Sequence, residues 1–265
     1  MSYSHVLMSA AHEGRPLGRS ELLAEAARFY WYHCVELSPG VVTDGDYDMA
    51  PLWSRYGFPE DMTGMNVLDV GRGSGFFAFA FEDLGANVVA TEIGSLADWD
   101  WVGGPAAHAE QVVAYPRFAA TDALGAFHFA KAIRASNVEA RTLNVYELDP
   151  SRLDGRCFDL VFAGSLASHL RDPILAFARL RSVTRGLCIV AAPSFEIPAV
   201  AEYAMTALVG MADKDLRSWW VMNARGLRET LRCAGFAKVE VVSAFRLQHR
   251  HRDVAVDHLV AHAWP

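Results

Sequence analysis

The chain has 265 residues, of which 52% are hydrophobic, and carries 24 Lys and Arg against 31 Asp and Glu, so its formal net charge is −7. This length and apolar content exclude a disordered chain and predict a compact globule, which we interpret as one large domain with additions. The acidic balance gives no overall basic footprint for nucleic acid, whose phosphates are bound by faces rich in Lys and Arg.

The first eighteen residues lack a basic region followed by an unbroken apolar stretch, so no secretory signal is predicted. No run approaches the roughly 18 apolar residues of a membrane span. The cysteines are widely spaced, without a Cys-x-x-Cys pair or a zinc-like Cys/His cluster, which indicates free thiols in a reducing compartment. We therefore expect a cytoplasmic protein without membrane or metal partners.

The N-terminal part predicts helical and irregular segments. Residues 21–32 place apolar side chains at helical spacing, which predicts an amphipathic helix. Residues 33–48 collect acids around Pro39, Gly40 and Gly45 and are predicted to form a loop, and residues 51–63 form a helix or turn. We expect residues 1–63 to form a cap or lid on a domain of residues 64–265.

From residue 65 the pattern alternates between strands and helices. Strand 65–70, a glycine turn at 71–75, helix 76–85 and strand 87–91 form a βαβ unit of about 30 residues. Further predicted strands lie within 138–148, 157–166, 187–192 and 237–245, and further helices at 174–184 and 224–234. Unbroken Val, Ile and Leu runs of this kind predict a parallel sheet covered on both faces. The long connections 94–135 and 193–223 are predicted lids over a substrate pocket.

The strongest motif is VLDVGRGSGFF, in which Gly71, Gly73 and Gly75 follow a strand. Glu92 ends the next strand, 21 residues after Gly71, where a carboxylate can take the two hydroxyls of a ribose. The dinucleotide fingerprint would need a third glycine at position 76, which is Phe. Asp69 would oppose a pyrophosphate but suit an ammonium group, so the turn favours S-adenosylmethionine (SAM) over a nicotinamide or flavin.

VLDVGRGSG with VVATEI resembles motif I and the following acidic strand of the class I SAM-dependent methyltransferases, and FDLVFAGSLASHLRDP is similar to their fourth-strand motif. The resemblance implies a Rossmann-like, doubly wound, mostly parallel seven-stranded sheet with SAM as cofactor. In it the glycines contact methionine and ribose, Asp69 faces the amino group, residues 144–145 contact adenine, and residues 165–166 lie near the methionine. The implied cofactor-binding residues are Asp69, Gly71, Gly73, Gly75, Glu92, Ile93, Asn144, Val145, Ser165 and Leu166.

More narrowly, WYHCVELSPGVVTDGDYD and SWWVMNARGLRETLRCAGF resemble the DUF1698 group, which includes enzymes that modify the wobble uridine of tRNA with carboxy-SAM. Those enzymes have an aromatic residue before the histidine of the fourth-strand motif, whereas this chain has Ser168 before His169. The acidic charge and scarcity of lysine also fit tRNA poorly. We therefore expect ordinary SAM and a small-molecule substrate, in natural-product metabolism.

Three residues are candidates for catalysis. His169 ends the fourth strand and is a candidate general base, with helix capping or packing as the equal alternative. His33 follows Trp31 and Tyr32, which either close over the ligands or form a structural aromatic lid. Asp44 lies in an acidic loop that lacks the downstream Glu of a calcium loop, so a solvated loop or a contact with a substrate ammonium group is expected. The candidate substrate residues are Trp31, Tyr32, Trp219, Trp220 and Asn223, with a core or interface role as the alternative for the last three.

The basic cluster at 249–252 either meets an anionic substrate group or, the favoured interpretation, is a solvated and frayed strand end. The predicted function is methyl transfer to an O, N or C nucleophile, by in-line displacement that needs mainly proximity and orientation. Three alternatives stay open: a non-methylating elimination or cyclisation on the same fold, tRNA uridine modification, and an inactive partner subunit. A homodimer or a protein partner also stays open.

Overall fold

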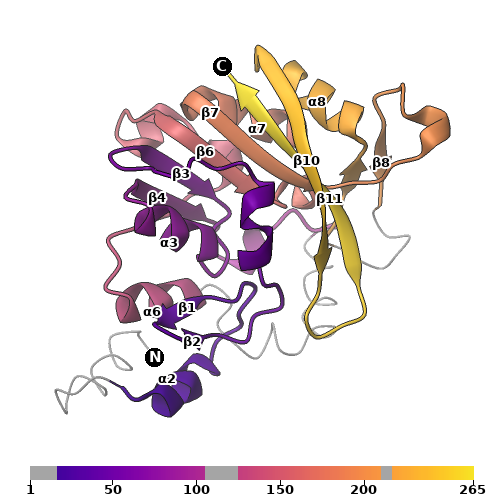
Figure 1. Cartoon of the computed structure of the whole chain (residues 1–265). Coiled ribbons are helices and arrows are strands. Elements are labelled where there is room, and N and C mark those ends of the chain that lie inside the picture. Colours follow the sequence, from indigo (N-terminus) through magenta and orange to yellow (C-terminus); the bar gives the residue numbers. More distant parts are fainter. Residues whose placement is uncertain (1–16, 105–124, 210–216) are drawn as a thin grey trace.

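The computed structural model describes residues 17–104, 125–209 and 217–265. Its centre is a seven-stranded sheet in the order β10-β11-β7-β6-β3-β4-β5 (Figure 1). Strands β7, β6, β3, β4 and β5 are mutually parallel, whereas β11 pairs antiparallel with both β7 and β10. The strands are β3 (Asn66–Val70), β4 (Asn87–Glu92), β5 (Glu139–Thr142), β6 (Phe158–Gly164), β7 (Thr184–Pro193), β10 (Lys238–Gln248) and β11 (Ala255–Trp264). This confirms the predicted Rossmann-like fold.

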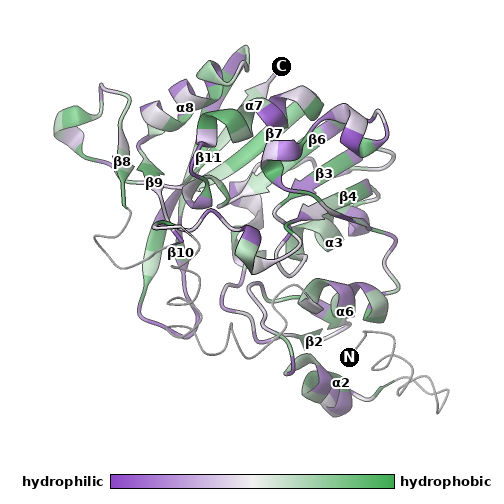
Figure 2. Ribbon diagram, turned by 180° about the vertical axis from the view of Figure 1, so that it is seen from behind, coloured by the Kyte–Doolittle hydropathy of each residue, from purple (hydrophilic) through white to green (hydrophobic). Residues whose placement is uncertain are grey.

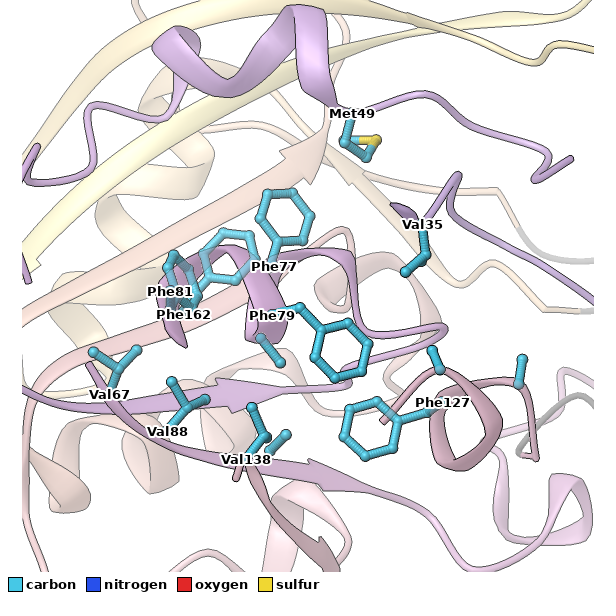
Figure 3. Packing of buried hydrophobic residues seen from close by; sticks show 14 of the residues in the cluster. Val35, Met49, Val67, Phe77, Phe79, Phe81, Val88, Phe127, Val138 and Phe162 are labelled. Atoms are coloured by element: carbon cyan, nitrogen blue, oxygen red, sulfur yellow. The ribbon is translucent and has the colours of Figure 1, made fainter. Parts of the chain in front are cut away.

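Each face of the sheet is covered by its own hydrophobic cluster, because successive strand residues point to opposite faces. On β3, Val67 joins a cluster with Phe77, Phe81 and Phe162 (Figure 3), whereas Leu68 joins the cluster beneath α7 and α8. Figure 2 shows apolar residues concentrated along the central strands and on the inner sides of these helices. The helices are α2 (Arg19–Ala26), α3 (Phe76–Asp83), α6 (Gly125–Ile133), α7 (Pro173–Val183) and α8 (Ala224–Cys233).

Shorter elements surround the sheet. Two small antiparallel pairs are β1 (Glu36–Ser38) with β2 (Val41–Val42), and β8 (Thr206–Leu208) with β9 (Trp220–Met222). The 3-10 turns are η1 (Ala50–Arg55), η2 (Leu96–Asp98), η3 (Val145–Glu147), η4 (Pro150–Leu153), η5 (Ala167–His169) and η6 (Pro198–Val200). The chain reverses its direction across the sheet between β3 and β6, and ligands of open α/β sheets bind at such a switch point, outside the carboxyl ends of the strands.

Two predictions for the N-terminal part are wrong. The helix predicted for 21–32 ends at Ala26, and the loop predicted for 33–48 contains the β1–β2 pair. The reason is that the next residues leave the helix to pair with the acidic segment: Trp31 O accepts from Asp46 N at 3.0 Å, and Tyr32 O accepts from Tyr47 N at 2.9 Å. The backbone is thus satisfied by a distant segment instead of by further helical turns.

The C-terminal part also differs from the prediction. No strand was expected after 245, yet β11 occupies an inner position of the sheet, and Val260 and Ala261 on it are fully buried. The segment connecting β10 to β11 is therefore the tip of a hairpin and not a frayed end. Figure 1 shows this hairpin reaching past the sheet toward the N-terminal segment.

Candidate functional site

A cavity of about 400 Å³ lies at the carboxyl ends of β3, β4 and β6. Its walls come from the glycine turn, from the ends of β4 and β6, from the N-terminal segment and from the β10–β11 hairpin. The sequence-predicted residues that line it are Tyr32, His33, Gly71, Gly73, Glu92, Ile93, Asn144, Val145, Ser165, Leu166 and His169. The sheet topology thus brings together residues that are up to 137 positions apart in the sequence (His169 minus Tyr32).

The glycine turn is fixed against the end of β4. Gly71 N donates to Thr91 O at 3.0 Å, and Gly73 N donates to Glu92 Oε2 at 3.1 Å. Gly71 and Gly73 have φ values of +77° and +51°, in the left-handed region where a Cβ is disfavoured. The bare turn therefore lets a ligand approach the backbone closely.

Glu92 is held with both carboxylate oxygens in place. Its Oε1 accepts from Ile93 N at 3.0 Å, in addition to the bond from Gly73 N to Oε2. Burial raises the pKa of this carboxyl, and Arg72 and the two backbone bonds oppose that rise. A carboxylate has about four acceptor positions, so two stay available toward the cavity.

Behind the turn lie two further charged side chains, Asp69 and Arg72, which together with Glu92 form the glycine-turn cluster. Within the described residues, Asp69 Oδ2 and Arg72 Nε and Nη1 are buried without a hydrogen-bond partner. Burial and the nearby Glu92 raise the pKa of Asp69 to about 7. The Arg72 guanidinium lies 4.4 Å from the centre of the Phe127 ring.

Two residues predicted to contact the cofactor lie outside the cavity lining. Asp69 is 2% exposed and lies beneath the turn, so it does not face a ligand directly. Gly75 is the N-cap of α3 with φ of +95°, and an added Cβ would lie 2.6 Å from atoms of Phe79 and Phe127. Its role is close packing of the helix start, which is the third function that glycine has in such turns.

Among the residues that the structure describes, three histidines line the cavity, in different surroundings. His33 is buried among aromatic rings, with Tyr32 at 4.8 Å and Phe77 at 5.7 Å between centres, and burial lowers its pKa to about 3. His169 Nδ1 lies 2.7 Å from Arg217 O. His258, which the sequence did not single out, has Nδ1 3.0 Å from Val256 O and Nε2 3.0 Å from Ser165 Oγ.

Four of the predicted substrate residues lie outside the cavity. Trp31 is buried in the core, donates from Nε1 to Ala26 O at 2.8 Å, and packs on Phe129. Trp219 and Trp220 donate their indole N–H groups to backbone carbonyls of Asp100 and Arg171. Asn223 caps α8, where its Oδ1 accepts from Gly226 N at 2.7 Å. These four side chains bond to backbone groups and do not form the surface of the cavity.

Asp44, predicted as a catalytic residue, also lies outside the cavity lining. Arg250 Nη1 donates to its Oδ1 at 2.8 Å. Its neighbour Asp46 accepts from the Tyr30 hydroxyl at 2.6 Å and lies 3.5 Å from His249 Nε2. We call Asp44, Asp46, His249 and Arg250 the strap cluster. The segment 249–252 is therefore not a frayed end, because His249 and Arg250 fasten the hairpin tip to the acidic loop. Arg250, His251 and Arg252 are nevertheless exposed, as the prediction of a solvated segment expects.

Sequence reasoning missed much of the opposite wall. It includes the rings of Tyr30, Tyr47 and Trp99, the aliphatic Leu247 and Val256, and His258 of β11. The spacing of Tyr30 and Tyr32 was a usable signal for one face of an extended segment, since alternate residues share a face. The hairpin residues carried no comparable signal, because their position depends on the strand pairing of β11.

Across the described ranges, no helix has the length and apolar content needed to cross a membrane. In the same ranges, no three His, Cys, Asp or Glu side chains converge as a metal site would require.

Comparison with known proteins identifies the fold of the chain. No family model matches the sequence, and no curated protein matches it significantly, so the narrower DUF1698 resemblance has no support from these comparisons. The structure is similar to the N-terminal domain of EvdMO1 with SAH bound, with a TM-score of 0.56 and 16% identity over 94% of this chain and 98% of that domain.

Two further solved structures support the same fold. Full-length EvdMO1 is matched with a TM-score of 0.54 and 20% identity over 93% of this chain, which spans only 47% of that protein. The YcgJ protein from Bacillus subtilis gives a TM-score of 0.51 and 14% identity over 77% of this chain and 94% of that one. At these identities the likeness shows that the chain has the class I methyltransferase fold.

Proposed function

We propose that this protein is a SAM-dependent methyltransferase that acts on a small molecule. One observation carries the proposal. At the switch point of the sheet, the glycine turn lies against a carboxylate that backbone hydrogen bonds hold in place. Gly73 N donates to Glu92 Oε2 at 3.1 Å, and both residues line the cavity.

The chain's residues fit SAM along the whole wall. Glu92 has acceptor positions left for the two ribose hydroxyls. Ile93 and Val145 supply apolar surface for an adenine, beside the polar Asn144. Acidic side chains at the cavity, Glu92, Asp98 and Asp100, suit the cationic sulfonium and ammonium groups. When bound, SAM supplies an activated methyl group.

The remaining wall fits a small acceptor molecule. A cavity of about 400 Å³ falls in the range of small-molecule sites. Beyond the space for SAM its surface is formed by aromatic rings, among them Tyr30, Tyr32 and Tyr47, and by aliphatic side chains of the hairpin. These residues exclude water from an acceptor and hold it beside the methyl group, which is the main requirement for such a displacement.

EvdMO1 has also been crystallised in the presence of SAH and D-fucose, which makes D-fucose a reasonable first trial acceptor for this chain. A role in natural-product metabolism, a cytoplasmic location, and the division into a cap of residues 1–63 and a domain of residues 64–265 stay predictions.

The proposal is tested in two steps. Calorimetric titration of the wild-type protein with SAM and with SAH should give dissociation constants in the micromolar range. Incubation with SAM labelled in the methyl group and with trial acceptors should then give SAH and labelled product in equal amounts. Formation of product without loss of the labelled methyl group from SAM would favour the non-methylating alternative, and absence of SAM binding would overturn the proposal.

A further inference from the structure

Ser165 and His258 form a hydrogen-bonded pair at the cavity. Ser165 follows the last residue of β6 and has φ of +56°, a left-handed conformation that costs on the order of 1–3 kcal/mol in a residue other than glycine. Its amide donates to Ala191 O at 2.8 Å, which holds the backbone in this conformation. Its Oγ lies 3.0 Å from His258 Nε2. The next residue, Leu166, packs against Gly71, so the pair lies beside the glycine turn.

The hydrogen bonds assign the proton on the His258 ring. Val256 O can only accept, so Nδ1, 3.0 Å away, carries the hydrogen. Burial lowers the pKa of His258 from its ordinary value, which favours the neutral ring, and a neutral ring with its hydrogen on Nδ1 has a free electron pair on Nε2. The Ser165 hydroxyl therefore donates to Nε2. The ring is also stacked on Phe245, with 5.1 Å between centres and an angle of 6° between planes. His258 is thus an oriented base.

The other two cavity histidines fit this role less well. Burial lowers the pKa of His33 to about 3, which makes it a weak base at neutral pH. Within the described residues its Nδ1 lacks a hydrogen-bond partner, so no group fixes its ring by that atom. His169 is anchored through Nδ1 to Arg217 O and lies close enough to His258 to depress the pKa of that residue. His169 also lines the cavity.

We propose that His258 is the proton acceptor for a substrate hydroxyl group, and that this hydroxyl receives the methyl group. The inference rests on the proposed function. The hydroxyl takes the place of the Ser165 hydroxyl at His258 Nε2. As the oxygen–carbon bond forms, the carbon–sulfur bond of SAM breaks with its electron pair left on sulfur, and the hydroxyl proton ends on Nε2. The imidazolium then releases its proton to water, so atoms and charge balance. Ser165 is a positioning residue.

The acceptor class follows from the same chemistry. A neutral alcohol or phenol is a weak nucleophile and gains reactivity when a base withdraws its proton in the transition state. A neutral amine attacks through its own free pair and has no need of a base before the step. A buried neutral imidazole with its free pair at the cavity is therefore suited to a hydroxylated substrate and to a methyl ether as product.

The main experiment compares His258→Asn with two matched variants. Asn keeps an N–H near the Val256 carbonyl and removes the Nε2 position. With labelled SAM and D-fucose, catechol and benzylamine as acceptor probes, wild-type protein should methylate a hydroxyl compound, and kcat should fall at acidic pH along one titration. His258→Asn should lower kcat at least about 100-fold and remove that titration. His169→Asn should lower kcat less than about 10-fold and keep the titration.

Controls separate catalysis from folding. His262 lies on the same strand, bonds to Tyr56 O through Nε2 at 2.8 Å and does not line the cavity, so His262→Gln should leave kcat unchanged. SAH binding by calorimetry should stay within twofold in all three variants. Methyl transfer to benzylamine, or retention of the acid titration by His258→Asn, would overturn the inference. Failure of the proposed function is distinct, because wild-type protein would then bind no SAH.

A second measurement needs no acceptor. Nitrogen-15 spectra of histidine-labelled protein with SAH, assigned by the signals lost in His258→Asn, should show His258 neutral with its hydrogen on Nδ1 at pH 7.5. A hydrogen on Nε2, or a charged ring, would overturn the inference even if none of the three probes is methylated.

Discussion

The cavity is flanked by two clusters of charged side chains that differ in how fully their polar atoms are bonded. In the strap cluster, the two acids bond to Arg250, His249 and the Tyr30 hydroxyl. In the glycine-turn cluster, buried atoms of Asp69 and Arg72 have no hydrogen-bond partner within the described residues. An unbonded buried polar atom costs on the order of 1–3 kcal/mol, so the protein is stabilised by one cluster and strained by the other.

The two clusters differ in the role that their positions indicate. The strap cluster lies outside the cavity lining and joins two segments 206 residues apart, which is a structural task. The glycine-turn cluster includes Glu92 at the cavity, and its unbonded charges lie directly behind the turn. Carboxyl groups with perturbed pKa values occur preferentially at binding and catalytic sites. Neutralising an acid should therefore have opposite effects on stability in the two clusters.

The largest effect is expected on ligand affinity from Glu92→Ala. Since Glu92 is proposed to accept the two ribose hydroxyls, its loss should weaken SAH binding about 100-fold, or about 2.7 kcal/mol. Calorimetric titration measures the change, with Asp44→Ala as the matched removal of an acid from the strap cluster. Equal affinity losses in the two variants would break the comparison.

The second effect is a gain in stability from Asp69→Asn. The pKa of Asp69 is about 7 in the folded protein and 3.8 in the unfolded chain. Between these pH values the folded protein binds more protons than the unfolded chain, so the free energy of unfolding falls as pH rises from about 4 to about 7. Asp69→Asn has no carboxyl group to ionise, so its free energy of unfolding does not fall in this pH range. The variant should be more stable than wild type by about 2 kcal/mol at pH 8. Urea denaturation at pH 4.5 and pH 8 checks this. A variant less stable than wild type at pH 8 contradicts it.

Asp46→Asn should have the opposite sign. Its carboxylate accepts from the Tyr30 hydroxyl and faces His249, so neutralisation weakens a charge-assisted bond. The free energy of unfolding at pH 7 should fall by about 1 kcal/mol. Urea denaturation measures this change in stability. The affinity for SAH should stay within about twofold of the wild-type value. A gain in stability here would show that the strap cluster is strained as well.

The smallest effect belongs to the pair of Asp44 and Arg250. Both side chains are well exposed, at 70% and 40%, and exposed ion pairs contribute little. A double-mutant cycle with Asp44→Ala and Arg250→Ala should give a coupling energy of about 0.5 kcal/mol, reduced further in 0.5 M salt. A coupling above about 2 kcal/mol would show that this pair, and not Asp46, holds the strap.

The parallel half of the sheet and its glycine turn were predictable because their signals are local. Apolar runs mark β3 and β4, and Gly71 and Gly73 are required by the backbone angles of the turn itself. The placement of Glu92 followed from the strand length alone. Asp69 was placed at the ligand because sequence distance cannot tell the surface of a turn from the layer beneath it.

The antiparallel half depended on distant contacts. Asp257, His258 and His262 make β11 appear polar in sequence, yet His258 is 2% exposed because β7 and β10 enclose the strand. Trp31 and Asn223 were expected at the substrate because of their neighbours. Their contacts instead come from a helix that ends early and from the first turn of α8.

The position of β11 inside the sheet also constrains how the protein is made. Strand β10 joins the sheet only through β11, which the ribosome synthesises later. Until residues 255–264 emerge, β7 is an open edge that carries fully apolar residues such as Ile189 and Val190, and an edge of this kind invites pairing with other chains. The nascent chain therefore passes through a stage with a formed parallel half of the sheet and an aggregation-prone edge, and we expect chaperones to matter most there.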